Sequence, residues 1–230
     1  MKTSINILKS LESLKRNCEV DKMFEGHFIP WRKSRINKLI SILGLEWFQG
    51  KKILELGCGF GHVGHELIKL GCDVTFTEGR NQFINVIKKN NPDSNVYLVD
   101  NDENWMLGSR FDLIIHWGLL YHLKNWKQDL KNCLWHSSLI CLETEVVDSE
   151  EDIEIEVKET NYDGALNSVG VRPSVGNIEK FLQSLGCEIT RYDDSDLNAA
   201  YMKYDWKAGS FPGQWKLGHR RFWMVTGRGV

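Results

Sequence analysis

An acidic residue followed by three alternating glycines is the part of this sequence best suited to hold a ligand. Glu55 stands two residues before Gly57, and Gly59 and Gly61 follow at every second position. Glycines have no Cβ, so the backbone can turn sharply there and approach a ligand closely. The first N–H groups of a helix that begins after such a turn point at the ligand. These residues together predict a pocket of the nucleotide-binding type.

The residues on both sides of the glycines have the patterns of a strand and a helix. Residues 53–56 form a short apolar run, which is typical of a buried strand in a parallel sheet. Residues 62–70 carry apolar side chains at helical spacing. A strand, a glycine turn and a helix in this order position a nucleotide in α/β proteins.

Two families of nucleotide-binding proteins share this geometry. Residues 59–64 match G-x-G-x-x-G, the dinucleotide fingerprint. Residues 55–61, Glu-Leu-Gly-Cys-Gly-Phe-Gly, resemble the first motif of class I S-adenosylmethionine-dependent methyltransferases. A carboxylate at position 55 would repel a pyrophosphate, whereas it suits the ammonium of a methionine moiety. The residues therefore favour the methyltransferase resemblance, with an NAD-dependent oxidoreductase as an alternative.

Further acids follow the next two predicted strands. Glu78 ends the strand predicted over residues 73–78, where a carboxylate accepts hydrogen bonds from the ribose hydroxyls in either family. Asp100 follows the strand predicted over residues 95–99, with Asn101 beside it. In class I methyltransferases an acid at this place typically accepts the adenine amino group. Both positions support a ligand that carries adenosine.

A second resemblance begins at the fourth predicted strand. Residues 111–118, FDLIIHWG, are followed directly by residues 119–123, LLYHL. This phrase is similar to the fourth motif of the same methyltransferases, many of which read FD…LxH there. Because both motifs occur in the expected order, we favour the methyltransferase family over the dehydrogenases.

The resemblance implies S-adenosyl-L-methionine as the cofactor and methyl transfer as the reaction. For the base we expect His116 or His122, because histidine exchanges a proton near neutral pH. Tyr121, Glu143 and Arg172 are further candidates for contact with the acceptor. The cofactor-binding residues implied by the motifs are Glu55, Gly57, Cys58, Gly59, Gly61, Glu78, Asp100, Asn101, His116 and Trp117.

The order of the predicted elements is that of the class I fold. We expect an α/β protein with a seven-stranded, mostly parallel sheet, helices on both faces and an antiparallel last strand. A helical cap at residues 1–48 would precede a methyltransferase domain at 49–230. The predicted strands are residues 53–56, 73–78, 95–99, 111–118, 138–145, 188–192 and 221–226, and the main predicted helices are residues 31–45, 62–70, 80–90, 126–135 and 174–185.

Two segments are longer than simple connections require. They cover residues 146–173 and 193–219, and both contain aromatic side chains interspersed with Asn, Asp or Arg. Long insertions at the carboxyl edge of an open sheet commonly hold the substrate. Such residues suit a polar small molecule or a glycan, and packing of the aromatics onto the sheet is an equal alternative.

Composition limits the remaining possibilities. The 230 residues carry a formal net charge of −2, so the overall charge does not indicate binding to a polynucleotide or an anionic membrane. A local basic patch is compatible with this net charge. The six cysteines form no C-x-x-C pair and indicate reduced thiols in a cytoplasmic protein. His62 and His65 lie one helical turn apart without a third ligand, so no metal site is predicted. No signal peptide or membrane span is recognisable.

We therefore expect a methyltransferase that acts on a polar small molecule or a glycan, with O-methylation favoured. One alternative is a tRNA wobble-uridine methyl or carboxymethyl transferase, because residues 172–174 and 185–187 resemble that branch, although Cys187 replaces its usual Phe. A methyltransferase-like binding module without activity is another. The intact carboxylates and glycines of the first motif argue against the latter.

Overall fold

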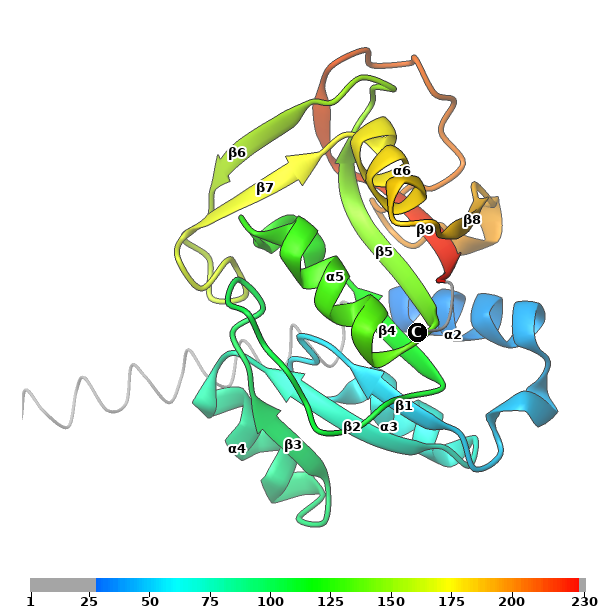
Figure 1. Ribbon diagram of the computed structural model, residues 1–230, viewed down its shortest axis with the longest axis vertical. Helices are drawn as coiled ribbons and strands as arrows, with labels where there is room; N and C mark the ends of the chain where they lie inside the picture. Colours follow the sequence, from blue (N-terminus) through cyan, green and yellow to red (C-terminus); the bar gives the residue numbers. More distant parts are fainter. Residues whose placement is uncertain (1–27, 228–230) are drawn as a thin grey trace, which may run out of the picture.

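A seven-stranded sheet forms the centre of the protein (Figure 1). The structure is a computed structural model that describes residues 28–227, so the predictions for residues 1–27 lie outside it. The strand order is β3-β2-β1-β4-β5-β9-β8. These strands are β1 (Lys52–Glu55), β2 (Asp73–Glu78), β3 (Asn95–Leu98), β4 (Leu113–Trp117), β5 (Leu139–Val147), β8 (Glu188–Tyr192) and β9 (Trp215–Thr226).

The register confirms the predicted fold class. Strands β1 to β5 pair in parallel, whereas β9 runs antiparallel to both of its neighbours, β5 and β8. The strand order reverses between β1 and β4, and open α/β sheets bind ligands beyond the carboxyl ends of the strands at such a point. The helices are α2 (Ile29–Leu43), α3 (His62–Lys69), α4 (Asn81–Asn90), α5 (Trp126–His136) and α6 (Val175–Ser184).

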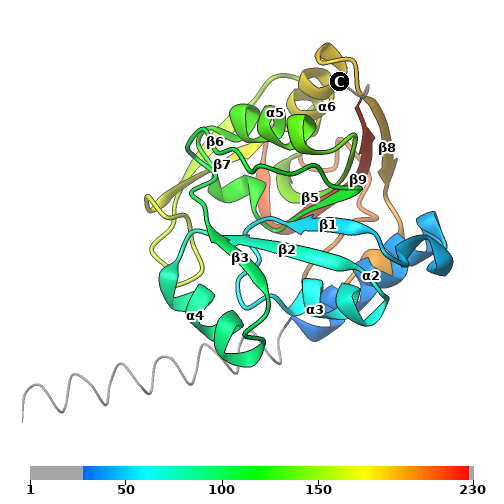
Figure 2. The same cartoon turned by 60° about the horizontal axis from the view of Figure 1, so that its bottom comes forward.

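Helices cover both faces of the sheet because alternate strand residues point to opposite sides. Ile53 and Leu113 belong to the core that α2 and α3 cover. Leu54 and Ile114 belong to the core that α5 and α6 cover. Figure 2 shows α5 and α6 above the sheet, with α2, α3 and α4 below it.

The first predicted insertion contains a hairpin that was not anticipated. Strands β6 (Glu154–Lys158) and β7 (Val169–Pro173) pair with each other in a separate two-stranded sheet, apart from the main one (Figure 1). In β6, charged residues alternate with Ile155 and Val157, which is the pattern of a half-buried strand. The strand was not recognised in the sequence because the acidic residues 148–152 directly precede this alternation.

The last strand is longer than predicted. It begins at Trp215 rather than at residue 221, and an irregularity between Glu145 and Val147 of β5 lets Val147 pair with Trp215. The second insertion therefore shortens, and its end becomes part of the sheet. Within residues 28–227, no helix has the length and apolar character needed to cross a bilayer.

Candidate functional site

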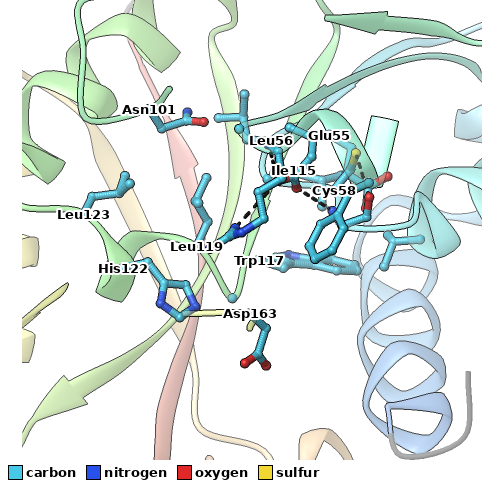
Figure 3. Close-up of a pocket in the computed structure, with 18 of the residues that line it drawn as sticks. Glu55, Leu56, Cys58, Asn101, Ile115, Trp117, Leu119, His122, Leu123 and Asp163 are labelled. Carbon is cyan, nitrogen blue, oxygen red and sulfur yellow. Dashed lines mark hydrogen bonds and ion pairs between the residues drawn. The ribbon is translucent and has the colours of Figure 1, made fainter. Parts of the chain in front are cut away.

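A pocket lies at the carboxyl ends of β1, β2 and β4, where the strand order reverses (Figure 3). Its walls come from the glycine loop, the ends of β2 and β3, the segment after β4, the start of α2 and the loop between β6 and β7. Ten of its residues are labelled in Figure 3: Glu55, Leu56, Cys58, Asn101, Ile115, Trp117, Leu119, His122, Leu123 and Asp163.

Glu55 ends β1 and is buried beside the first turn of α3. Its Oε2 accepts a hydrogen bond from the backbone N–H of Gly64, at 2.8 Å. Burial raises the pKa of the Glu55 carboxyl to about 8, although the hydrogen bond from Gly64 opposes the shift. A cation bound beside Glu55 would therefore favour its ionised form.

The glycine loop presents bare backbone to the pocket at Gly57 and Gly59. Gly57 has a φ of +55°, and a Cβ on it would lie 2.8 Å from the side chain of Leu119. Gly59 also has a positive φ, and its N–H donates to Glu78 Oε2 at 2.9 Å. Gly61 is the N-cap of α3 and does not line the pocket, so it shapes the turn. The loop is an open cradle at Gly57 and Gly59.

Glu78 stands at the end of β2 with its carboxylate held by the backbone. Besides the N–H of Gly59, the N–H of Arg80 donates to it, at 3.0 Å from Oε1. Burial raises the pKa of the Glu78 carboxyl, while these backbone hydrogen bonds oppose the shift. The side chain lines the pocket, where a carboxylate can accept further hydrogen bonds.

Asp100 and Asn101 both line the pocket, beyond the end of β3. Asp100 is half-buried, and its Oδ1 accepts from the N–H of Asp102 at 3.0 Å. Asn101 is buried, and its Nδ2 donates to Asp129 Oδ1 of α5 at 2.7 Å. That bond fixes the orientation of the Asn101 amide.

The structure places His116 away from the pocket, contrary to the expectation that it would bind cofactor or act as a base. Its side chain is fully buried, and its Nε2 lies 2.6 Å from Asp129 Oδ2. In a strand, neighbouring side chains point to opposite faces, so His116 faces α5. His116 therefore does not contact a ligand in this pocket, and we assign no catalytic role to it.

His116, Asp129 and Cys133 form the one potential metal-ligating cluster found within residues 28–227. Ligand atoms of a tetrahedral zinc site lie roughly 3.3 Å apart, since each is about 2.0 Å from the ion. The separation of 2.6 Å between His116 Nε2 and Asp129 Oδ2 is a hydrogen-bond distance. The cluster is therefore a hydrogen-bonded network within the core.

Trp117 and Tyr121 line the part of the pocket beyond β4. The Trp117 ring lies 6.4 Å from the ring of Trp31 of α2, in an edge arrangement. Arg220 donates to the Tyr121 hydroxyl at 3.2 Å and to Glu143 Oε1 at 3.1 Å. Burial raises the pKa of Tyr121, so its hydroxyl stays protonated at neutral pH. This part of the pocket combines aromatic rings with one buried guanidinium group.

His122 also lines the pocket and lies below Asn101 in the view of Figure 3. Its Nδ1 lies 2.5 Å from Glu159 Oε2. Burial opposes the ionisation of Glu159, but the hydrogen bond and charge of His122, together with Arg172, outweigh it and lower the pKa of Glu159 to about 2. Since an ionised carboxylate only accepts hydrogen bonds, Nδ1 is the donor and Nε2 is free for a ligand.

Two parts of the wall were not predicted from the sequence. Phe28, Trp31 and Arg32, at the start of α2, line the pocket, as do residues 163–166 of the β6–β7 loop. The sequence placed residues 28–32 in the predicted helical cap, but it did not indicate that Arg32 would line the pocket. The β6–β7 loop reaches the pocket only because the hairpin folds back.

The aromatic residues of the second insertion are not in the pocket wall. Tyr204 is buried, and its hydroxyl donates to Glu143. Trp206 packs against Arg221, and Trp215 against Arg172. These aromatic side chains therefore pack within the protein, which was the alternative to a role in substrate binding.

The sheet order, the glycine loop and the acids after β1, β2 and β3 define a Rossmann-like domain that binds a nucleoside. Residues 28–192 match a family model described as a methyltransferase domain, which covers more than half of the chain. The chain belongs to the class I S-adenosylmethionine-dependent methyltransferases. The family model describes an enzyme domain that transfers methyl groups.

The relatives whose activity is named share about a quarter of their residues with this chain. The tRNA U34 carboxymethyltransferase of Pseudomonas putida is 26% identical over 195 residues, which cover 72% of this chain and 58% of that protein. The enzyme of the same name from Ectopseudomonas mendocina is 27% identical over 190 residues, with the same coverage. The chain thus spans little more than half the length of these relatives.

Solved structures show the same fold. The N-terminal domain of EvdMO1 with SAH bound has a TM-score of 0.63 at 18% identity, over 91% of this chain and 85% of that one. The DhpI–SAH complex has a TM-score of 0.60 at 15% identity, over 93% of this chain and 92% of that one.

Proposed function

We propose that this methyltransferase transfers a methyl group to a hydroxyl oxygen of a polar small molecule or a glycan. The observation that supports this proposal most is His122, whose Nε2 is free at the pocket while its Nδ1 is held by Glu159. A hydroxyl acceptor must lose a proton, and a histidine in this arrangement accepts one.

One half of the pocket suits the cofactor. Gly57 and Gly59 have positive φ and present bare backbone to the pocket, which fits S-adenosyl-L-methionine lying against it. Glu55 would face the methionine ammonium, Glu78 the ribose hydroxyls, and Asp100 with Asn101 the adenine. These groups are the acceptors that an ammonium, a diol and an amino group require.

Arg32 completes the methionine end of this half. It lines the pocket from the first turn of α2, close enough to Glu55 for its charge to lower the pKa of that carboxyl. We assign Arg32 to the carboxylate of the methionine moiety, because a guanidinium group binds carboxylates well. With Phe28 and Trp31, it makes α2 a cap over the pocket.

The other half of the pocket suits the acceptor. Trp31 and Trp117 provide ring faces, and Tyr121, His122 and Asp163 provide hydrogen-bonding groups. The bound cofactor supplies a methyl group on a positively charged sulfur, which is already activated toward a nucleophile. The residues of the chain therefore have to align the acceptor and take its proton.

Two solved structures of similar fold were determined with a further compound besides the methyl donor or its product. One describes the N-terminal domain of EvdMO1 in the presence of SAH and D-fucose, and another a DhpI–SAM–HEP complex. Their TM-scores to this chain are 0.61 and 0.60. For this chain we favour a sugar hydroxyl as the acceptor, because D-fucose is a sugar and His122 can take the proton of a hydroxyl group.

A tRNA acceptor is the second candidate. It is favoured by the tRNA U34 carboxymethyltransferases that match 72% of this chain. The net charge of −2 opposes it, because phosphate contacts supply most of the affinity for a nucleic acid. A methyltransferase-like module without activity is disfavoured by the retained carboxylates of Glu55 and Glu78.

A screen with a radiolabelled methyl donor tests these candidates. Sugars, nucleosides, small hydroxylated acids and total tRNA are offered separately, and the label in each product is counted. We expect label on a hydroxylated small molecule or glycan, and a loss of about 10²-fold in its rate for His122→Ala. His219→Ala is the control, because His219 does not line the pocket. Label on tRNA alone would replace the proposal with the second candidate.

A further inference from the structure

Glu159 is a buried carboxylate that binds three N–H groups at once. Its Oε2 accepts from His122 Nδ1 at 2.5 Å and from the backbone N–H of Ala165 at 2.7 Å. Its Oε1 accepts from Arg172 Nη1. Glu159 does not itself line the pocket, so none of the roles proposed above includes it.

These contacts determine how the His122 ring is presented. In the neutral ring, donation from Nδ1 to Glu159 leaves the lone pair on the second ring nitrogen. Within residues 28–227, no group hydrogen-bonds to Nε2, and this atom is not among those buried without a partner. The ring also packs against Tyr121, with the ring centroids 4.0 Å apart. Nε2 is therefore held in a fixed orientation and is accessible at the pocket.

The same carboxylate fixes the loop that closes the cofactor side. Ala165, which Glu159 binds, lines the pocket together with Gly164. The Gly164 carbonyl accepts from Arg80 Nη2, and the Arg80 N–H donates to Glu78. Hydrogen bonds, together with the covalent bonds of Arg80 and of the loop, therefore connect Glu78, the proposed ribose-binding residue, to His122.

We propose that Glu159 is a positioning residue, which fixes the tautomer and orientation of His122. The inference rests on the proposed function, methyl transfer to a hydroxyl. The acceptor O–H bond breaks, and its proton passes to His122 Nε2. The oxygen electron pair forms the bond to the methyl carbon while the carbon–sulfur bond breaks and leaves a thioether. Glu159 stays ionised and stabilises the imidazolium.

Nuclear magnetic resonance of the full chain with isotope-labelled histidine measures the tautomer directly. In the wild type we expect neutral His122 to carry its proton on Nδ1. Glu159→Gln removes the acceptor-only carboxylate, so a mixture of tautomers is expected. Glu156→Gln is the matched control, because Glu156 is exposed on the same hairpin and makes no contact with His122. The control should retain the Nδ1–H form.

Binding and turnover then distinguish positioning from general stability. For Glu159→Gln we expect the dissociation constant of S-adenosylhomocysteine to stay within about threefold of the wild type. With the hydroxyl acceptor found in the screen, kcat falls by about 10²-fold, and KM for the donor stays within about threefold. Glu156→Gln leaves all three values unchanged.

Each outcome decides the proposal. The Nδ1–H tautomer in the wild type, together with a fall in kcat for Glu159→Gln, supports it. A wild-type His122 with its proton on Nε2 overturns it, even where Glu159→Gln does not fold. Unchanged turnover in a folded Glu159→Gln protein also overturns it. Failure of the wild type to bind S-adenosylhomocysteine refutes the proposed function instead, and the tautomer measurement keeps the two failures apart.

Discussion

Glu55 Oε2 and the backbone N–H of Gly64 are 2.8 Å apart and hydrogen-bonded, so the end of β1 is tied directly to the first turn of α3. The side chain of Glu55 is only 4% exposed. A carboxyl group buried in this way favours its neutral form until a cation arrives. The residue that we assign to the methionine ammonium is thus a source of instability in the protein without cofactor.

Replacement of Glu55 by Gln should change how stability depends on pH. The folded-state pKa is raised from 4.5 to about 8, so the stability contributed by Glu55 is complete below about pH 4.5 and is lost as pH rises through about 8. In the absence of cofactor, we expect the free energy of unfolding of the wild type to decline relative to Glu55→Gln across this window. Denaturant unfolding at a series of pH values measures the difference.

The same variant should bind the cofactor more weakly. Loss of the carboxylate removes a charge-assisted hydrogen bond, which corresponds to a reduction in affinity of about tenfold or more. Parallel stability curves for the two proteins, or an undiminished affinity in the variant, would show that Glu55 does not have this role.

Gly64→Ala should destabilise the protein, although Gly64 itself does not line the pocket. A Cβ on Gly64 would lie 2.3 Å from the Phe76 ring and 2.5 Å from Glu55 Oε2. Overpacking of this kind costs about 1–3 kcal/mol. Gly108→Ala is the control, because a Cβ there meets nothing within 4 Å. Thermal unfolding of both variants checks the prediction, and equal melting temperatures would contradict the tight contact of α3 with β1.

Glu78→Gln should weaken cofactor binding. The carboxylate accepts N–H groups from both Gly59 and Arg80, and an amide at this place must turn its NH₂ group toward one of these donors. We expect the affinity for S-adenosylhomocysteine to fall about 10- to 100-fold by calorimetry. Glu103→Gln, at an exposed position outside the pocket, should bind normally. Normal binding by Glu78→Gln would remove the ribose assignment.

Glu143→Gln should destabilise the fold. The Glu143 carboxylate is fully buried and pairs with Arg35 at 3.2 Å and with Arg220 at 3.1 Å. Removal of its charge leaves two guanidinium groups under-compensated in the core, which costs about 3–5 kcal/mol. Chemical denaturation measures this loss. A change below about 0.5 kcal/mol, the range of surface substitutions, would mean that solvent reaches the pair.

Several residues that line the pocket could be predicted from the sequence, because they belong to short, local motifs. Glu55, Gly57 and Gly59 lie within five residues of one another, and strand alternation places Glu78 at the same edge of the sheet. The fold class followed from the order of apolar runs. The roles of the individual residues in binding remain predictions.

The acceptor half was harder to predict, because its residues meet only through tertiary structure. Glu159 and His122 are 37 positions apart, and a hairpin that the sequence did not reveal brings them together. His116 and Trp117 are neighbours in the sequence, yet one faces α5 and the other the pocket. Side chains alternate between the two faces of β4, and this alternation decides which of the two residues reaches the pocket.

Titration calorimetry with S-adenosylhomocysteine and with NADH tests the central claim most directly. We predict that the wild-type chain binds one equivalent of S-adenosylhomocysteine, that Glu78→Gln weakens this binding, and that NADH produces no heat of binding. Binding of NADH by the wild type, with no heat from S-adenosylhomocysteine, would contradict the account.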